Sequence, residues 1–177
     1  MAKILAFAGS NSSTSINYQL VKHTTSLVEN HEIRLLNMVN YPFPMYSPDL
    51  EKKEGYSNSL VELKNDIQKS DALFISVNEH NGMPSAYFKN VLDWLSRLER
   101  KFLLNKKVLL MSTSPGQRGG IGALEMIEAV LPRFGGEVVA TFSLPSFTAN
   151  FDPGKGITNS GHEQSHRKAL ETFLAAL

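Results

Sequence analysis

A run of hydroxyl side chains near the start of the chain could bind an anionic group. Between Gly9 and Asn17 the sequence reads GSNSSTSIN, with five hydroxyls and no charged residue. An apolar segment precedes this run and a helical pattern follows it. The first N–H groups of a helix are unpaired and its dipole is positive there, which favours a phosphate. A helix N-cap needs only one hydroxyl, so the run predicts a phosphate site.

The type of phosphate follows from what the loop lacks. It has no lysine in the pattern GxxxxGK[ST], which disfavours nucleoside triphosphate hydrolysis. It also lacks the pattern GxGxxG of the usual dinucleotide-binding turn. The loop therefore favours a terminal monophosphate.

Two other loops share this composition. NEHNGMPS begins at Asn78 and STSPGQRGG begins at Ser112, and each follows an apolar segment. In an open parallel sheet, ligands bind beyond the carboxyl ends of the strands, where the strand order reverses. We therefore expect the three loops to meet at one edge of a sheet and to form a single site.

The elements that must position these loops alternate along the chain. The predicted strands are Lys3–Ala8, Glu32–Met38, Ala72–Val77, Lys107–Ser112 and Glu137–Ser143. The predicted helices are Ile16–Asn30, Ser57–Lys69, Pro84–Arg100, Gly120–Phe134 and Ser160–Ala176. Nearly continuous apolar strands such as ALFISV are typical of a parallel sheet that is covered on both faces. The pattern predicts one doubly wound α/β domain over residues 1–177.

The composition excludes several classes of function. The chain has 177 residues, no cysteine and a formal net charge of +1. Thiol catalysis and cysteine-bound metal centres are therefore excluded, and the balanced charge argues against nucleic acid as a partner. No segment has the roughly 20 apolar residues that span a bilayer, and no signal peptide is evident. These features predict a cytoplasmic protein that binds neither membranes nor nucleic acid.

A competing motif lies near the C-terminus. HEQSH, from His162 to His166, matches HExxH, which places two histidines and Glu163 on a helix in zinc proteases. No third ligand follows at a suitable spacing, since Glu171 lies off the line of the two histidines. A zinc hydrolase is therefore the weaker alternative, and no metal site is expected.

Three segments resemble the NADPH-dependent FMN reductase family, which has a flavodoxin-like fold. GSNSSTSIN resembles its phosphate loop, Gly-Ser-x-Arg-x-x-Ser-x-Asn. NEHNGMPSAYFKNVLDWLSR resembles its Pro-Glu-Tyr-Asn loop and the helix after it, and STSPGQRGG resembles its third flavin loop. The resemblance runs nearly end to end, and the middle segment is the most specific. It implies a five-stranded parallel sheet of order 2-1-3-4-5.

The resemblance also implies a set of FMN-binding residues. They are Ser10, Ser12, Ser15, Ile16, Asn17, Asn78, Glu79, His80, Asn81, Gly82, Ser114, Pro115, Gly116 and Gly119. Ser12 stands where the family often has arginine, which removes one charge-assisted phosphate contact. Asn78 and His80 replace the usual proline and tyrosine, and His80 is expected near the edge of the flavin ring.

The implied activity is an FMN-dependent NAD(P)H oxidoreductase. NADPH or NADH would reduce the flavin, and a small acceptor such as a quinone, an azo compound, a metal oxyanion or free flavin would take the electrons. No catalytic side chain is required, because the flavin carries the hydride. A flavodoxin-like electron carrier without nicotinamide activity is the alternative, although such carriers are usually acidic.

The segment Pro84–Arg100 is apolar around most of its circumference. Such a helix is buried on two sides. The sheet explains one side, and a subunit interface that includes Trp94 would explain the other; packing of Trp94 within its own chain is the alternative. We therefore expect a homodimer or homotetramer.

Two long loops, Asn40–Tyr56 and Leu144–Gly156, are rich in proline and aromatic residues and could shape the site. Outside the loops, His23 and His31 are predicted to be surface residues. Arg118 is either a solvated loop charge or a contact to a nucleotide.

Overall fold

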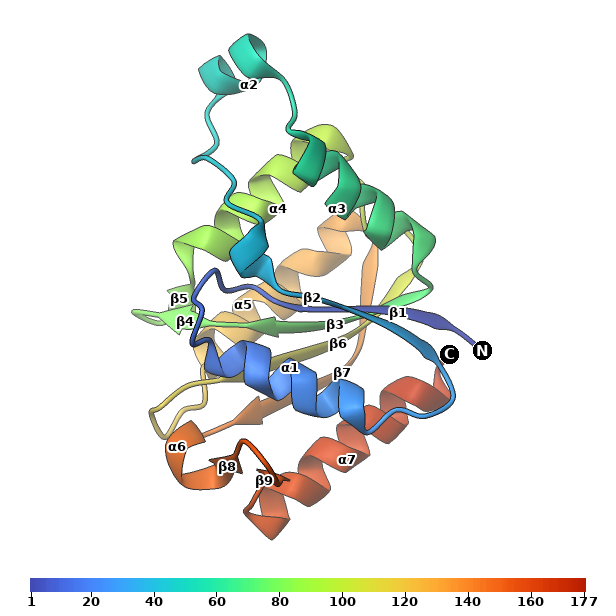
Figure 1. Ribbon diagram of the computed structural model, residues 1–177, viewed down its shortest axis with the longest axis vertical. Helices are drawn as coiled ribbons and strands as arrows, with labels where there is room; N and C mark the ends of the chain where they lie inside the picture. Colours follow the sequence, from blue (N-terminus) through green and yellow to red (C-terminus); the bar gives the residue numbers. More distant parts are fainter.

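A five-stranded parallel sheet forms the centre of the molecule (Figure 1). The computed structural model describes residues 1–177, and the sheet has the order β2-β1-β3-β6-β7. Its strands are β1 (Lys3–Ala8), β2 (Glu32–Leu36), β3 (Ala72–Val77), β6 (Lys106–Thr113) and β7 (Gly136–Leu144). The strand order reverses between β1 and β3, as the flavodoxin-like prediction requires, and the predicted fold class is confirmed.

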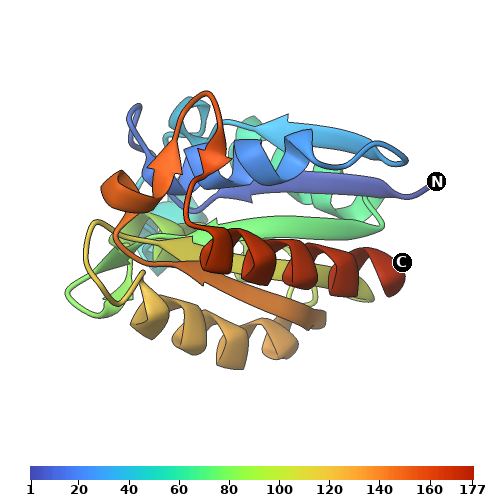
Figure 2. The ribbon, with the colours of Figure 1, turned by 90° about the horizontal axis from the view of Figure 1, so that it is seen from below.

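Helices cover both faces of the sheet (Figures 1 and 2). One face carries α3 (Asn58–Lys69), α4 (Ala86–Leu98) and α5 (Ile121–Val130), and the other carries α1 (Ile16–Ser26) and α7 (Ser160–Ala175). Side chains of β1 alternate between the two cores: Leu5 and Phe7 pack toward α3 and α4, and Ile4 and Ala6 toward α1 and α7. The continuous apolar strands read from the sequence are therefore buried on both faces, as expected.

Several predicted boundaries are wrong by a few residues, and local hydrogen bonds explain them. Helix α1 ends at Ser26 rather than Asn30, where the hydroxyls of Thr25 and Ser26 donate to carbonyls of the last turn. Strand β2 ends at Leu36, because the Asn37 side chain accepts from Val39 N–H and starts the short helix η1 (Met38–Asn40). Pro132 ends the α pattern after α5, and the chain continues as the 3₁₀ helix η2 (Leu131–Phe134).

Both long loops contain short elements that the sequence pattern did not reveal. The first holds α2 (Pro48–Glu54), which Ser47 caps by accepting from Leu50 N–H. The second holds α6 (Phe147–Asn150) and a hairpin of β8 (Phe151–Asp152) and β9 (Gly156–Ile157). A further hairpin, β4 (Glu79–His80) with β5 (Met83–Pro84), lies between β3 and α4. None of the helices combines the length and apolarity that a bilayer crossing requires.

The first long loop forms an arm, residues 41–56, that covers the outer side of α4. Trp94 is only 4% exposed, and its indole Nε1 donates to the carbonyl of Pro44 at 2.7 Å. The Asn90 side chain accepts from Tyr46 N–H and donates to Pro44 as well. The second apolar side of α4 is therefore buried within the same chain, and Trp94 packs as in the alternative that the sequence left open.

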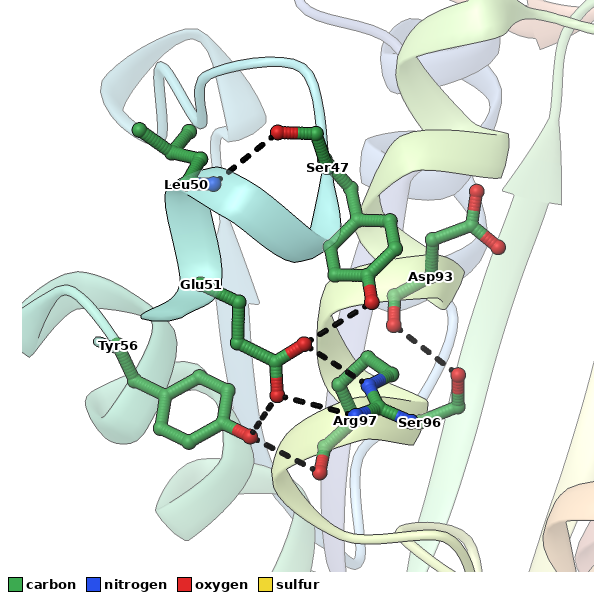
Figure 3. A network of polar contacts seen from close by, with 8 residues as sticks. Ser47, Leu50, Glu51, Tyr56, Asp93, Ser96 and Arg97 are labelled. Carbon is green, nitrogen blue, oxygen red and sulfur yellow. Dashed lines mark hydrogen bonds and ion pairs between the residues drawn. The ribbon is translucent and has the colours of Figure 1, made fainter. Parts of the chain in front are cut away.

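A carboxylate holds the far end of the arm to α4 (Figure 3). Glu51 on α2 accepts from Arg97 Nε at 3.0 Å and from the hydroxyls of Tyr46 and Tyr56 at 2.9 and 2.8 Å. These donors, Arg97 first among them, lower the pKa of Glu51 to about 2. The ionised carboxylate is thus the form that fastens the arm.

Gly9 after β1 is required by packing rather than by backbone conformation. A β-carbon at Gly9 would lie 2.5 Å from the ring of Phe88 on α4. The Gly9 carbonyl also accepts from the hydroxyl of Ser85, which caps α4 by accepting from Phe88 N–H. The close approach of α4 to the end of β1 therefore fixes the position of the loop that begins at Gly9.

Arg97→Met is expected to release the arm at neutral pH. Trp94, the only tryptophan, will then be exposed and its emission will shift to longer wavelength, whereas Lys101→Met will leave it unchanged. In the wild type the contribution of Glu51 is complete above its unfolded pKa and is lost as the pH falls toward 2. Tryptophan emission followed from pH 7 to pH 2 in all three proteins checks this; an unshifted spectrum for Arg97→Met contradicts it.

Gly9→Ala is expected to destabilise the fold by about 1–3 kcal/mol, because the added methyl overlaps Phe88. Phe88→Leu should make room for it. The double variant is then expected to lose at least about 0.5 kcal/mol less than the sum of the single losses. Urea unfolding of the four proteins measures this coupling, and strict additivity would show that the two positions do not meet.

Candidate functional site

The three loops meet in one cleft of about 200 Å³ at the carboxyl edge of the sheet. Ten of the fourteen residues predicted from the sequence line it, which leaves out Asn81, Gly82, Gly116 and Gly119. Its lining residues are Ser10, Ser12, Thr14, Ser15, Ile16, Asn17, Asn78, Glu79, His80, Thr113, Ser114 and Pro115. Thr14 and Thr113 were missed, although both lie in loops that the sequence had singled out. The cleft lies where the strand order reverses between β1 and β3.

The hydroxyl loop uses one side chain as a cap and presents the others. Ser15 is the N-cap of α1, and its hydroxyl accepts from Tyr18 N–H at 3.1 Å. The N–H groups of Ile16 and Asn17 have no protein acceptor. Ser12 and Thr14 are exposed, and their hydroxyls lie 3.3 Å apart. The two hydroxyls hydrogen-bond to each other, and one hydroxyl proton of the pair remains for a ligand. The loop therefore offers unpaired backbone donors and exposed hydroxyls at one helix N-terminus.

The side chain of Asn17 points away from the cleft into the protein. It is 2% exposed, its Oδ1 accepts from Ser76 Oγ and from Thr113 N–H at 2.7 and 3.0 Å, and its Nδ2 donates to the Thr113 carbonyl. The amide thus joins α1 to the ends of β3 and β6. What Asn17 presents to the cleft is its backbone N–H.

The second wall is a hairpin, where the sequence had suggested an irregular loop. Asn81 and Gly82 join β4 to β5 with φ of 53° and 75°. Two successive positive φ values are those of a type I′ turn, for which Asn-Gly is the favoured pair. The dipeptide was the signal that could have revealed the hairpin. Asn81 and Gly82 lie at its exposed tip, which is why neither lines the cleft.

Glu79 connects the second wall to the third. Its Oε2 accepts from Ala123 N–H at 2.9 Å, in the first turn of α5, where the helix dipole favours a negative charge. A β-carbon at Gly122 would lie 2.9 Å from the same oxygen, so glycine there permits the contact. The carboxylate is therefore hydrogen-bonded to α5, and it holds the hairpin in place.

Beside Glu79, two of the three residues that depart from the family pattern lie together. Asn78 Nδ2 is 3.4 Å from His80 Nε2, and Asn78 Oδ1 is buried without a hydrogen-bond partner. An orphaned buried acceptor is uncommon in folded proteins and is costly. Here it stands at the cleft, where a donor group on a ligand could pair with it.

The third wall is supported from behind by glycines. The Gly119 carbonyl accepts from the hydroxyls of Ser112 and Ser143, and the Gly116 carbonyl accepts from Ser146 N–H. Gly119 has a φ of 61°, and a β-carbon there would lie 2.9 Å from the backbone nitrogen of Pro145. Gly116 and Gly119 therefore shape the loop that carries Ser114 and Pro115 to the cleft.

The HExxH motif does not form a metal site. His166 is fully buried on α7, and its Nε2 is 2.9 Å from Thr24 Oγ1. No three histidine, aspartate or glutamate side chains come together as a ligand set. His23 and His31 are both half-buried and partly open to solvent. His23 also stacks on His166, and His31 accepts from Ala2 N–H. Arg118 is exposed.

The residues that line the cleft fit the phosphate end of FMN. The hydroxyl loop supplies backbone and hydroxyl donors and no acidic side chain, and the one carboxylate at the cleft, that of Glu79, is paired with α5. An anion would therefore meet donors without a facing negative charge.

Comparison with proteins of known sequence finds quinone reductases among the relatives. A quinone reductase of Escherichia coli is 35% identical over 77 residues, which are 44% of this chain and 41% of that protein. This match therefore spans about two fifths of the relative's length. An NADPH:quinone oxidoreductase of Arabidopsis thaliana is 27% identical over 124 residues, 68% of this chain and 62% of that protein.

The solved structures that match share the fold. The flavoenzyme FerB of Paracoccus denitrificans, an NAD(P)H:(acceptor) oxidoreductase, superimposes with a TM-score of 0.80 at 23% identity, over 99% of this chain and 96% of that one. The apo form of EMOB, an NADH:FMN oxidoreductase, gives a TM-score of 0.76 at 18% identity, over 100% and 90% of the two chains. Residues 2–149, which contain all three loops of the cleft, match the family described as NADPH-dependent FMN reductase, and the chain belongs to that family.

Proposed function

We propose that this protein is an FMN-dependent NAD(P)H oxidoreductase that passes electrons to a small acceptor such as a quinone, an azo compound, a metal oxyanion or free flavin. The observation that carries the proposal is the cleft at the strand reversal, where unpaired N–H groups of α1 lie beside the exposed hydroxyls of Ser12 and Thr14. Family membership and the names of the relatives support it.

The hydroxyl loop would hold the phosphate. Ile16 and Asn17 N–H groups, with the hydroxyls of Ser12 and Thr14, supply neutral donors at the positive end of the α1 dipole. The arginine common in the family is absent at position 12, so the phosphate would be bound without a cationic side chain. Backbone donors that are already in place need little reorganisation, which offsets part of that loss.

The other two walls would hold the flavin ring. The β4–β5 hairpin, fixed by Glu79 to α5, would place its backbone and the Asn78 amide at the polar edge of the ring. Bound FMN would supply the redox chemistry, taking a hydride from NADPH or NADH and releasing electrons to the acceptor. The side chains of the cleft bind and orient, and none is needed as a nucleophile.

The test is spectroscopic and kinetic. Protein loaded with FMN should show flavin absorption bands, and these should bleach anaerobically on addition of NADPH or NADH and return on addition of a quinone. Protein that binds FMN but is reduced by neither nicotinamide would be an electron carrier instead. Protein that gives no spectral change or fluorescence quenching with FMN would overturn the proposal.

Assembly into a homodimer or homotetramer is still proposed, on new grounds. The arm covers the apolar side of α4 that first suggested it, but other large apolar side chains remain exposed, among them Met45, Met83 and Leu104 at 69%, 60% and 57%. Light scattering at micromolar concentration decides between the assembly and a monomer.

Charge at position 12 is expected to control FMN affinity, because Ser12 is exposed and lines the cleft. Unit charges ~4 Å apart interact by about 4 kcal/mol at an effective dielectric constant near 20, and solvent reduces this. We expect Ser12→Arg to tighten and Ser12→Asp to weaken FMN binding about tenfold each, or about 1.4 kcal/mol.

Riboflavin, which lacks the phosphate, is the matched control and should bind all three proteins alike. Fluorescence titration of both flavins measures the effect. Equal FMN affinities for the two folded variants would place the phosphate elsewhere.

A further inference from the structure

A row of aromatic rings runs from α7 to the third wall of the cleft. The rings of His166 and His23 are stacked with centroids 5.6 Å apart, and His23 meets the edge of Phe151 at 5.7 Å. Phe151 stacks on Phe147 at 4.6 Å, and Phe147 N–H donates to the carbonyl of Ser114, which lines the cleft. Two titratable rings are thus connected to the site through Phe151 and Phe147.

His23 is the member of this row that solvent can reach. It is half-buried and lines a groove of about 500 Å³ between α1 and the β8–β9 hairpin. Gly156 on β9 has a φ of 82°, and a β-carbon there would overlap the His23 ring. The hairpin backbone therefore lies directly against His23, whose ring also stacks on His166.

His166 is held as a neutral ring with one defined tautomer. Thr24 Oγ1 has a single proton and donates it to the carbonyl of Leu20, one helical turn back, so it must accept from His166 Nε2–H. Nδ1 of His166 is buried and has no partner. A second proton on this ring would have no acceptor and would bring a charge into the core.

The surrounding charges do not favour a proton on either ring. Burial is the largest cause of the shift at both rings: it lowers the pKa of His23 and lowers that of His166 to about 4. Arg167 on α7 lowers both pKa values further. Glu163, the ion-pair partner of Arg167, raises both. Lys22 on α1 and Lys155 on the hairpin line the same groove as His23. From the strands, Met111 contacts Thr24 and Phe142 meets the ring of His166, and neither side chain titrates.

The neutral histidine stack stabilises the fold at neutral pH and loses this effect in acid. Both pKa values lie below the ordinary value for histidine, so the neutral pair is favoured in the folded state. The stabilisation is complete above about pH 6.5 and is lost as the pH falls toward 4. Two imidazolium rings 5.6 Å apart would also repel each other, so protonation would separate the stack.

We propose that His23 and His166 are positioning residues for the cofactor cleft, whose neutral stack holds the β8–β9 hairpin and, through Phe151 and Phe147, the wall that carries Ser114. Protonation opens the stack and loosens this wall, so that the protein releases FMN in mild acid while the rest of the fold stays intact. The release of FMN rests on the proposed function, whereas the opening of the hairpin does not.

The first experiment compares FMN affinity at pH 7.5 and pH 5.0 in the wild type and in His23→Phe, which keeps an aromatic ring and cannot titrate. His166→Gln is the second variant, because its amide can still donate to Thr24. His162→Gln, on the same helix and outside the stack, is the matched control. Protonation of the FMN phosphate is common to all four proteins and cancels in the comparison.

We expect the dissociation constant of the wild type and of His162→Gln to rise at least tenfold more on acidification than those of His23→Phe and His166→Gln. Parallel pH profiles for all four proteins would overturn the proposal. Trp94 lies on the opposite face of the sheet, so its emission reports on the rest of the fold. A shift of Trp94 emission to longer wavelength over the same pH range in the cofactor-free protein would also overturn it, because the release would then be general unfolding.

Hydrogen exchange of the cofactor-free protein separates this inference from the proposed function. After correction for the intrinsic pH dependence, amides of residues 147–158 should lose protection at pH 5.0 in the wild type and keep it in His23→Phe. If FMN binds at no pH, the proposed function fails, and exchange alone still decides whether the histidines hold the hairpin. If residues 147–158 are equally protected in both proteins at pH 5.0, the inference is wrong.

Discussion

The buried amide of Asn17 is the interaction on which the geometry of the cleft depends. Its three hydrogen bonds, to Ser76 and to both backbone groups of Thr113, join the first turn of α1 to the ends of two neighbouring strands. Breaking one of these bonds would leave a buried polar group unpaired, at a cost of about 1–3 kcal/mol. The donors at the α1 N-terminus are therefore held at a fixed position relative to the ends of β3 and β6.

The other two walls are fixed to each other rather than to the sheet alone. Glu79 joins the β4–β5 hairpin to α5. The carbonyls of Gly119 and Gly116 join the loop after β6 to Ser143 at the end of β7 and to Ser146 just after it. Loops usually carry the mobile parts of a protein, but each of these is tied at a point close to the cleft. Pre-formed loops reduce the ordering cost of binding, which suits a site that lacks a cationic side chain for its anion.

The sequence predicted the sheet and the composition of the cleft because both depend on local patterns. Continuous apolar strands and hydroxyls before a helix each have one dominant structural cause, and ten predicted residues line the cleft. The Asn-Gly pair was an equally local signal, and the hairpin that it marks was missed. The roles of Asn17 and Glu79 could not be predicted, because they depend on partners 96 and 44 residues away in the chain. The same holds for Trp94: a wide apolar helix face is compatible with a second subunit or with the arm, and only the long-range contact to Pro44 decides.

Two titratable contacts lie on opposite faces of the sheet: Glu51 holds the arm on one face, and His23 with His166 holds the β8–β9 hairpin on the other. Glu51 must be ionised to hold the arm, whereas His23 and His166 must be neutral to hold the β8–β9 hairpin. On acidification the histidine stack therefore loses its stabilisation first, from about pH 6.5 downward, and the arm loses its own only as the pH approaches 2. Because linkage is reciprocal, a ligand that orders the wall at Ser114 would in turn keep the two histidines neutral to lower pH. In the loaded protein, the hairpin would then lose its stabilisation at a lower pH. The anchors that hold the arm to α4 include no residue that lines the cleft, so the pH dependence of the arm would be the same with and without ligand.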